Sequence, residues 1–236
     1  MSKFMNFALT GIVSAIFLAG CGGGSSTTPA AVVTAAATTF ALQSGYKTRI
    51  ANGSTDNFTI SGTCSGSATI SDSTPSSATF EGSPALSVTG TATITFTNCT
   101  PSSFASTSTG YYDSNYNPLG HSIIGVEYGK FLTIPSPLPV SVKVGDTAVF
   151  GTETIYADST KQITTGQRTL SYVIETDGAS TSTAIANLIT KQFNTSSQLL
   201  FTQQSRYRMA ADGTLTIVSI DVQYATTSTN HLVYTK

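Results

Sequence analysis

The sequence predicts an all-β protein: an antiparallel, sandwich-like module in its N-terminal half and an up-and-down antiparallel meander, half-barrel or barrel-like, in its C-terminal half. From residue 40 onward, short segments rich in Val, Ile, Thr, Tyr and Phe are separated by Gly, Asn, Asp, Ser and Pro, a pattern typical of strands joined by turns. Residues 86–97 alternate apolar and polar side chains with Thr on one face, as a half-buried antiparallel strand does. Turn signals recur at strand-length spacing through the second half, which favours the meander.

Six strands are predicted in the first half, each bounded by turn residues. They are residues 40–49, 58–63, 67–71, 78–81, 86–97 and 121–134. The run Pro135-Ser136-Pro137-Leu138-Pro139 follows, and alternate prolines lack hydrogen-bond donors and hold an extended conformation. We therefore place a boundary there, between a module of residues 40–134 and a module of residues 140–236. A single continuous sandwich is the alternative.

The second half contains seven predicted strands. They are residues 140–144, 147–157, 168–176, 183–193, 198–209, 214–225 and 231–235. Residues 183–193 also fit helical spacing, but their Thr-rich flanks favour a strand. The apolar phase slips between Ile217 and Val218, and this slip predicts a β-bulge.

Composition excludes several classes of function. The 236 residues carry 11 Lys and Arg against 12 Asp and Glu, for a net charge of −1, and only 10% are charged. An average protein has about 25% charged residues. Without concentrated positive charge, the chain has no electrostatic footprint for nucleic acid. With 39% hydrophobic residues, it is not a disordered acidic tail either.

The N-terminus carries the pattern of an export signal. Lys3 precedes an uncharged, mostly apolar run over residues 7–18, which as a helix would span about 18 Å, short of the ~30 Å hydrocarbon core of a membrane. The next residues, Leu18-Ala19-Gly20-Cys21, resemble the lipobox of bacterial lipoproteins. This resemblance implies that residues 1–20 are a lipoprotein signal peptide and that Cys21, the first residue of the mature chain, carries a diacylglycerol thioether.

The same resemblance implies a cellular location. Gly22 stands where the inner-membrane retention signal of enteric bacteria has Asp, which implies the outer membrane of a Gram-negative host, with its periplasmic or surface face left open. Residues 21–39, rich in Gly, Ser, Thr and Ala, are expected to form the lipidated tether. The expected partners are the membrane, through this anchor, and either envelope proteins or a small apolar ligand.

Two further cysteines, Cys64 and Cys99, lie in strand-like runs of a chain expected to be exported, and thiols oxidise in such compartments. A bridge between them would close a loop of about 35 residues and stabilise the fold by roughly 3–4 kcal/mol. Two free thiols or a redox pair are the alternatives, but CxxC spacing is absent. We predict a disulfide.

Motifs that carry catalysis are few, so we expect no enzyme, cofactor or metal site. Residues 62–66 outline a hydrolase elbow with Cys64 in the nucleophile position, but more strand follows it and no base is near. His121 and His231 lie in different halves without Asp or Glu at helpful spacing. We interpret each as a surface or core histidine.

One predicted loop combines Tyr with Asp and Asn, and loops of this composition suit contacts with glycan or protein. The candidate contact residues are Tyr111, Tyr112, Asp113, Asn115, Tyr116 and Asn117. The D-x-N-x-N spacing matches the start of a calcium loop, but Pro118 and Ile124 replace the required Gly and Glu. An EF-hand is thereby excluded, and a looser calcium site is left open.

Arg206 and Arg208 share one face of the strand predicted over residues 198–209. Two guanidinium groups about 7 Å apart could hold an anionic head group, or they could simply keep the outer face of a sheet soluble.

Two functions remain after these exclusions. The first is a non-enzymatic envelope lipoprotein with a structural or protein-interaction role. The alternative is a module that binds a lipid or another small apolar ligand inside a curved meander. Strands that are apolar on both faces around an unfilled cavity would favour the second, and the alternation in residues 86–97 argues against it locally.

Overall fold

The structure is a computed structural model that describes residues 38–225 and 230–236. These residues form one helix, α1 (Leu42–Asn52), and thirteen strands. The strands are β1 (Ser54–Gly62), β2 (Gly66–Asp72), β3 (Ser76–Phe80), β4 (Ser83–Phe96), β5 (Ser103–Tyr112), β6 (Pro118–Ile123), β7 (Glu127–Phe131), β8 (Thr147–Tyr156), β9 (Thr164–Asp177), β10 (Ser180–Asn194), β11 (Leu199–Ala210), β12 (Leu215–Tyr224) and β13 (His231–Thr235). The expected signal peptide, Cys21 and most of the expected tether lie outside the described residues. Over the described ranges, no helix has the length and apolar character needed to cross a membrane.

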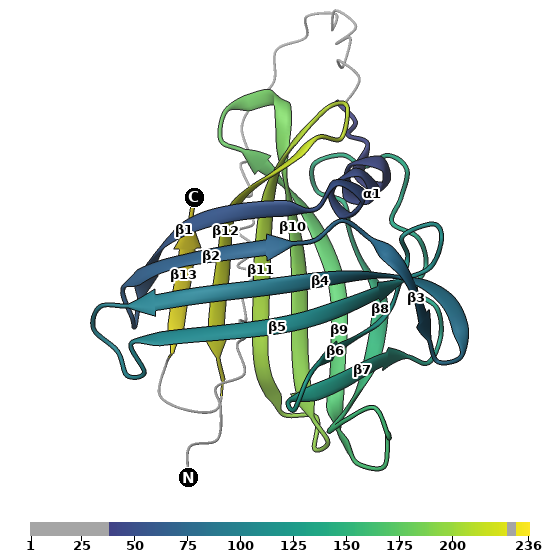
Figure 1. Cartoon of the computed structure of the whole chain (residues 1–236). Helices are drawn as coiled ribbons and strands as arrows, with labels where there is room; N and C mark the ends of the chain where they lie inside the picture. Colours follow the sequence, from purple (N-terminus) through teal and green to yellow (C-terminus); the bar gives the residue numbers. More distant parts are fainter. Residues whose placement is uncertain (1–37, 226–229) are drawn as a thin grey trace, which may run out of the picture.

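The strands form an antiparallel barrel (Figure 1). Twelve strands follow one another around the wall in the order β2-β1-β13-β12-β11-β10-β9-β8-β7-β6-β5-β4, and β4 closes the ring by pairing with β2. The first part of β4 pairs instead with β3, which extends beyond the ring. Closure removes the two free sheet edges that an open meander would expose.

The prediction of an all-β antiparallel fold is confirmed, and the closed ring goes further than the expected half-barrel or barrel-like meander. Strands of the two expected modules share one sheet. β1 pairs with β13, and β7 pairs with β8 across the proline-rich run at residues 135–139. Strands β1, β2, β4, β6 and β7, expected in a sandwich-like unit, therefore belong to the barrel wall.

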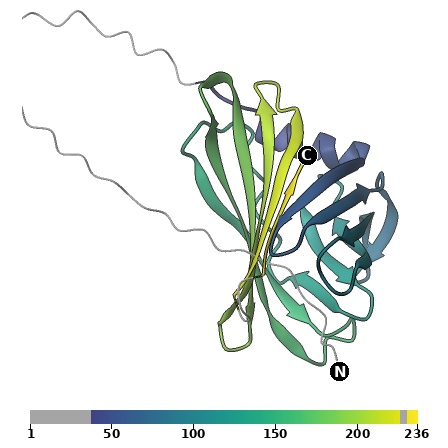
Figure 2. The same ribbon diagram turned by 90° about the vertical axis from the view of Figure 1, so that its left-hand side faces the viewer.

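Helix α1 covers one end of the barrel (Figures 1 and 2). The strand predicted over residues 40–49 is therefore wrong. Gly45 lies against the backbone of the β11–β12 turn, where a Cβ atom would have no room. Arg49 Nη2 donates to Asp56 Oδ2 at 2.8 Å, and its guanidinium lies 5.0 Å from the centre of the Tyr207 ring. Tertiary contacts with the barrel end thus hold a helix whose sequence shows strand-like alternation.

Other elements also differ from the sequence expectation. The strand predicted over residues 121–134 is a hairpin, β6 and β7, which reverses where Gly125 adopts a φ of +73°. Residues 140–144 form no named strand, and Val142 makes only an isolated bridge with Phe40. Strand β5 was not expected, because its Ser and Thr residues hide the apolar phase.

Two expectations for the second half are confirmed. Residues 183–193 are part of strand β10 rather than a helix. The register of β11 with β12 shifts where Arg206 pairs with Ser219 and Tyr207 pairs with Ile217, which leaves Val218 as the extra residue of a bulge. The bulge returns Ile217 and Ile220 to the same inward face.

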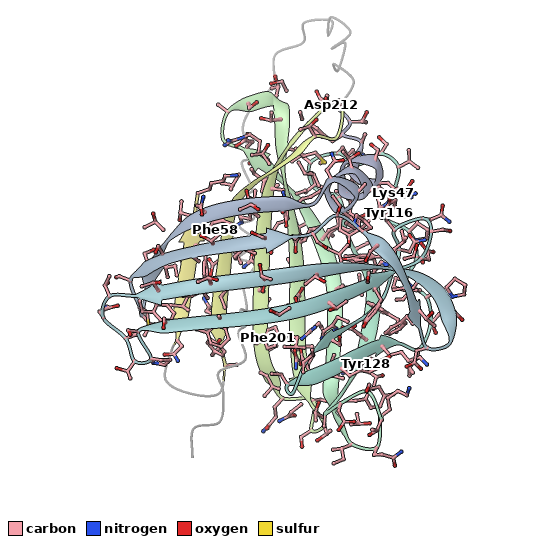
Figure 3. All side chains as sticks on the ribbon, viewed as in Figure 1. Lys47, Phe58, Tyr116, Tyr128, Phe201 and Asp212 are labelled. Atoms are coloured by element: carbon pink, nitrogen blue, oxygen red, sulfur yellow. A yellow bond between two sulfur atoms is a disulfide. The ribbon has the colours of Figure 1, made fainter. Side chains whose placement is uncertain are left out.

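Alternation along the strands separates the interior from the surface (Figure 3). In β4, Ile94 and Phe96 are buried, whereas Thr93 and Thr95 are exposed. One cluster of buried apolar residues lies on β1, β2, β4, β12 and β13, and a second lies beneath α1 around Ile174 and Met209. Outward-facing Thr gives the barrel a polar outer surface with few charged residues.

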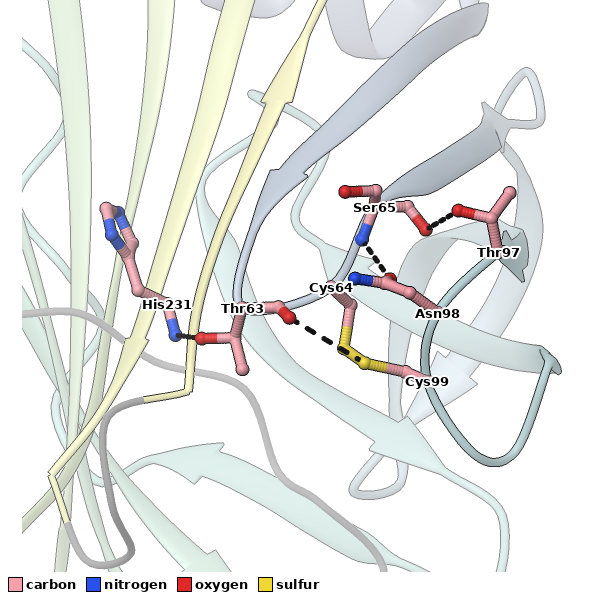
Figure 4. Close-up of a disulfide and its surroundings, with 7 residues drawn as sticks. All are labelled: Thr63, Cys64, Ser65, Thr97, Asn98, Cys99 and His231. Atoms are coloured by element: carbon pink, nitrogen blue, oxygen red, sulfur yellow. Dashed lines mark hydrogen bonds between the residues drawn. A yellow bond between two sulfur atoms is a disulfide. The ribbon is translucent and has the colours of Figure 1, made fainter.

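The predicted disulfide between Cys64 and Cys99 is present, with the Cα atoms 5.7 Å apart (Figure 4). It joins the β1–β2 turn to the β4–β5 turn, at the end of the barrel opposite α1. The backbone N–H of Ser65 donates to Asn98 Oδ1 at 2.6 Å beside it. The bridge therefore fastens the two turns next to the part of the ring where β1 pairs with β13.

Candidate functional site

A cavity of about 830 Å³ lies inside the barrel, within the range of roughly 300–1,000 Å³ found for small-molecule sites. Nearly every strand of the ring contributes to its wall, and Tyr46 of α1 borders it at the covered end. The cavity reaches solvent at the β6–β7 turn, because Ile124 belongs to its lining and is 92% exposed. The barrel is thus covered at one end and accessible near the other.

The opening coincides with an incomplete part of the wall. β5 pairs with β6 only from Ser108 onward, so residues 103–107 pair with β4 alone among the described strands. Part of this stretch, whose edge toward β6 is unpaired, lines the cavity together with residues 124–126 of the β6–β7 turn. We call residues 103–107 and 124–126 the mouth. Ile124 and Val126 are exposed apolar side chains there, so the rim of the mouth is apolar.

One side of the cavity is apolar. We call it the apolar wall, and it consists of Ile70, Ile94, Phe104, Ile220, Val222 and Tyr234. These residues come from β2, β4, β5, β12 and β13, whose inward positions form one continuous hydrophobic cluster. Such a surface favours an alkyl chain or a ring system, because each buried CH₂ group contributes about 0.8 kcal/mol.

The opposite side carries buried charge. We call it the charged cluster, and it consists of His121, Glu127, Glu153, Arg168 and Gln192. Register places three of these side chains in one row, because Glu153 lies opposite Arg168 and Arg168 lies opposite Gln192 on adjacent strands. Phe201 continues this row on β11 (Figure 3), and the Arg168 guanidinium lies 5.5 Å from the centre of its ring.

His121 lies between two carboxylates. Its Nδ1 is 2.8 Å from Glu153 Oε1, and its Nε2 is 3.0 Å from Glu127 Oε1. A carboxylate only accepts hydrogen bonds, so a ring with a proton on each nitrogen satisfies both contacts. Arg168 Nη1, which is also a donor, lies 2.9 Å from the same Nε2. Burial and the nearby Arg168 act to lower the pKa of His121, but the hydrogen bonds to the two carboxylates outweigh them and raise it above its ordinary value.

Arg168 completes the cluster. Its Nη2 donates to Glu127 Oε1 at 2.5 Å and to Gln192 Oε1 at 2.6 Å, and Gln192 Nε2 donates to Glu127 Oε2 at 3.1 Å. Burial acts to raise the pKa of Glu127, but Arg168 and His121 lower it to about 2. The carboxylate of Glu127 is therefore held in its charged form inside the barrel.

Gly129 makes room for this arrangement. A Cβ atom at this position on β7 would collide with the His121 ring and the Glu153 carboxyl group. Gly129 also lies directly opposite His121 in the β6–β7 ladder. The imidazole can lie between the two carboxylates only because its cross-strand neighbour has no side chain.

The candidate contact loop predicted from the sequence is divided between elements. Tyr111 and Tyr112 belong to β5, and only the residues after them form the turn. Tyr111 stacks on Phe80 with ring centres 4.6 Å apart, whereas Tyr112 lines the cavity. The function of this loop stays a prediction.

Asp113 stabilises the turn that follows. Its Oδ1 accepts from the backbone N–H groups of Asn115 and Asn117 at 2.7 and 2.9 Å, and its Oδ2 accepts from Asn117 Nδ2. Tyr116 reverses the chain with a φ of +63°. The D-x-N-x-N spacing thus serves an Asx-type turn in this structure.

Arg206 and Arg208 point outward, as expected, and both are paired. Arg206 Nε lies 3.4 Å from Glu175 Oε2, and Arg208 Nε donates to Asp177 Oδ2 at 2.6 Å. Neither residue lines the cavity. The proposed anion contact stays a prediction, and these ion pairs would compete with it.

The expectation that each histidine lacks a suitably spaced acid is wrong. His231 Nε2 lies 2.8 Å from Asp221 Oδ1 on the neighbouring strand, and His121 meets two carboxylates. Sequence reasoning missed the charged cluster, although one signal was present. Arg168 has the same strand phase as Leu170, Tyr172 and Ile174, and Glu153 has the same phase as Ile155. Charged residues in the apolar phase of a strand point into the interior.

The described chain therefore defines a class by its fold and site: a closed antiparallel barrel whose interior holds a cavity with one apolar and one charged side. Comparison with known proteins adds no relative, because no family model, no curated protein and no solved structure matches this chain.

Proposed function

We propose that this protein is a non-enzymatic binding protein of the cell envelope whose barrel holds a small amphiphilic or apolar ligand. The observation that carries the proposal is the cavity of about 830 Å³ between the apolar wall and the charged cluster. The interiors of small barrels are filled by side chains, whereas larger barrels enclose ligand cavities or channels. Of the two functions expected from the sequence, the cavity favours the ligand-binding role over the structural or protein-interaction role.

Buried charge supports the same proposal. Burying ionic groups costs free energy that apolar packing of similar volume would avoid, so a buried ionic cluster beside a cavity is a candidate functional site. Here two carboxylates, a guanidinium and an imidazole border a space that an apolar core could have filled. A mixed wall of this kind suits a ligand with an apolar body and a polar end.

The proposal includes a location. We propose that Cys21 carries the lipid anchor and that the barrel is held at the outer membrane. The lipobox-like residues 18–21 support the anchor. The disulfide between Cys64 and Cys99 supports export, because such bridges persist in oxidising compartments.

Native mass spectrometry of the purified protein tests ligand binding directly. We expect a bound species of lipid or metabolite size that leaves on denaturation. Two variants on β4 localise it. Ala92→Phe adds a ring on a residue that lines the cavity, whereas Thr93→Phe adds the same ring on the exposed outer face.

The two variants give opposite expectations. Ala92→Phe should lower occupancy about tenfold or more, and Thr93→Phe should leave it unchanged. A ligand-free mass for the wild-type protein, together with no binding of added lipids, would overturn the proposal and return the structural role to first place.

A further inference from the structure

The charged residues that line the cavity fall into two acids and two bases. They are Glu127, Glu153, Arg168 and His121, and among the described residues no other Asp, Glu, Lys or Arg belongs to the lining. With a doubly protonated imidazole, the four groups sum to zero. With a neutral imidazole, they sum to one negative charge. In neither state does the cavity carry an excess of positive charge.

The positive groups are also already engaged. Arg168 donates through Nη2 to Glu127 and through Nε and Nη2 to Gln192, while its Nη1 lies 2.9 Å from His121 Nε2. A ligand carboxylate could reach this guanidinium only beside the resident Glu127 and Glu153. Like charges at such distances repel, and they do so more strongly against the wall of a protein than in bulk water.

Uncharged polar groups meet no such obstacle. Ser106, Thr190 and Gln203 also line the cavity, and their hydroxyl and amide groups can donate to or accept from a hydroxyl, ester or amide of a ligand. Such a head group needs hydrogen bonds but no counter-charge.

We propose that the cavity takes amphiphiles whose polar head carries no net charge, with the tail on the apolar wall, and that it discriminates against fatty-acid anions. This inference rests on the proposed ligand-binding function and names its ligand class. Discrimination arises from the two resident carboxylates, which compete with an anionic head for Arg168.

Two probes with the same tail test the inference. Monolauroylglycerol and laurate share one acyl chain and differ in head charge at pH 8. Isothermal titration calorimetry of the wild-type protein, with both probes below their micelle-forming concentrations, measures the two dissociation constants. We expect monolauroylglycerol to bind at least about tenfold more tightly, a difference of about 1.4 kcal/mol.

A charge variant and a matched control extend the test. Glu153→Gln keeps an oxygen acceptor for His121 Nδ1 and removes one negative charge from the cavity, so laurate affinity should rise about tenfold. Glu175→Gln removes a carboxylate from the outer face, where Glu175 pairs with Arg206, and should leave laurate affinity unchanged.

The outcomes separate the two proposals. Laurate binding as tight as monolauroylglycerol binding in the wild-type protein would overturn the inference and leave the binding function intact. Binding of neither probe, with no ligand in the native mass spectrum, would overturn both. The wild-type comparison decides by itself, so the test does not depend on the folding of Glu153→Gln.

Discussion

Glu153 and Arg168 lie directly opposite each other on β8 and β9, yet Arg168 forms its shorter ion pair with a different carboxylate, that of Glu127. Arg168 Nη1 is 3.7 Å from Glu153 Oε2, whereas Arg168 Nη2 is 2.5 Å from Glu127 on β7. His121 explains the difference, because its Nδ1 contacts Glu153 Oε1 at 2.8 Å. The charged cluster therefore connects β6 through β10 instead of forming separate cross-strand pairs.

Stability should be greatest between about pH 4.5 and 6.5. The pKa of Glu127 is lowered to about 2 in the folded protein. The Glu127 carboxylate therefore stabilises the fold at pH values above its unfolded pKa of about 4.5, and this contribution is lost as the pH falls toward 2. The raised pKa of His121 stabilises the fold below about 6.5, and this contribution is lost as the pH rises through the folded value. Urea unfolding from pH 3 to 9 measures both limits.

A Glu127→Gln variant isolates the acidic limit, since other carboxylates also titrate there. A difference of one pKa unit corresponds to about 1.4 kcal/mol of stability. The lowered pKa of Glu127 therefore corresponds to about 3 kcal/mol, which arises jointly from Glu127 and the residues that contact it. The wild-type protein should lose more stability than the variant between pH 5 and 3. Parallel curves for the two proteins would show that Glu127 is not the titrating group.

Gly129→Ala should destabilise the protein by about 1–3 kcal/mol, the usual effect of overpacking a filled interior. The added methyl group would displace the His121 ring or the Glu153 carboxyl group. Thr93→Ala on the exposed face of β4 is the control, and it should change the free energy of unfolding by less than about 0.5 kcal/mol. Equal effects of the two changes would argue against close packing at Gly129.

Arg168→Met and Arg208→Met should differ strongly. The Arg168 side chain is 13% exposed and faces two buried carboxylates, so its removal should cost about 3–5 kcal/mol. The Arg208 side chain is 52% exposed, and solvent screens its pair with Asp177, so its removal should have a far smaller effect. Chemical denaturation compares them, and a large effect of Arg208→Met alone would reverse the ranking.

The double variant Cys64→Ser/Cys99→Ser should lose up to about 4 kcal/mol of stability, because the bridge closes a loop with a sequence separation of 35. Thermal unfolding with and without reductant measures the loss. Mapping of the unreduced wild-type protein should recover the two cysteines in one linked peptide pair, and separately alkylated thiols would contradict the bridge.

Cys21→Ser should abolish fatty-acid labelling of the protein and release it from the membrane fraction. Metabolic labelling with palmitate, followed by fractionation, checks both. Cys64→Ser serves as the matched control, because it removes a different cysteine and should leave labelling intact. Persistent labelling of Cys21→Ser would refute the proposed anchor.

The strand pattern could be predicted from the sequence where alternation is strong, as in β4, and where turns are marked by Gly or Asp. The prediction failed at α1. Gly45 lets this segment lie close against the end of the barrel, and that end exists only once the barrel has formed. It also failed at β5, where inward Ser106 and Gly110 interrupt the apolar phase. Closure of the ring depends on the pairing of β1 with β13, which is remote in sequence and leaves no local signal.

The charged cluster could not be assembled from sequence spacing, because its members come from five strands. His121 and Glu127 are close in the chain, but Arg168 and Gln192 reach them only through the register of β7, β8, β9 and β10. The alternation of inward and outward positions along β9 is enough to predict that Arg168 points inward. Which carboxylate it meets depends on the whole set of ladders.

The stretch of β5 at residues 103–107, which pairs with β4 but not with β6, bears on how fast the proposed ligand could exchange. A molecule entering between this stretch and the β6–β7 turn would break no hydrogen bond between β5 and β6, since β6 pairs with β5 only from Ser108 onward and the pairing with β4 lies on the other edge of β5. The barrier to entry is then set by rotation of side chains such as Ile124 and by motion of the turn around Gly125. Such motions occur in about nanoseconds to microseconds, so loading and release can proceed while the disulfide and the ring of strands stay intact.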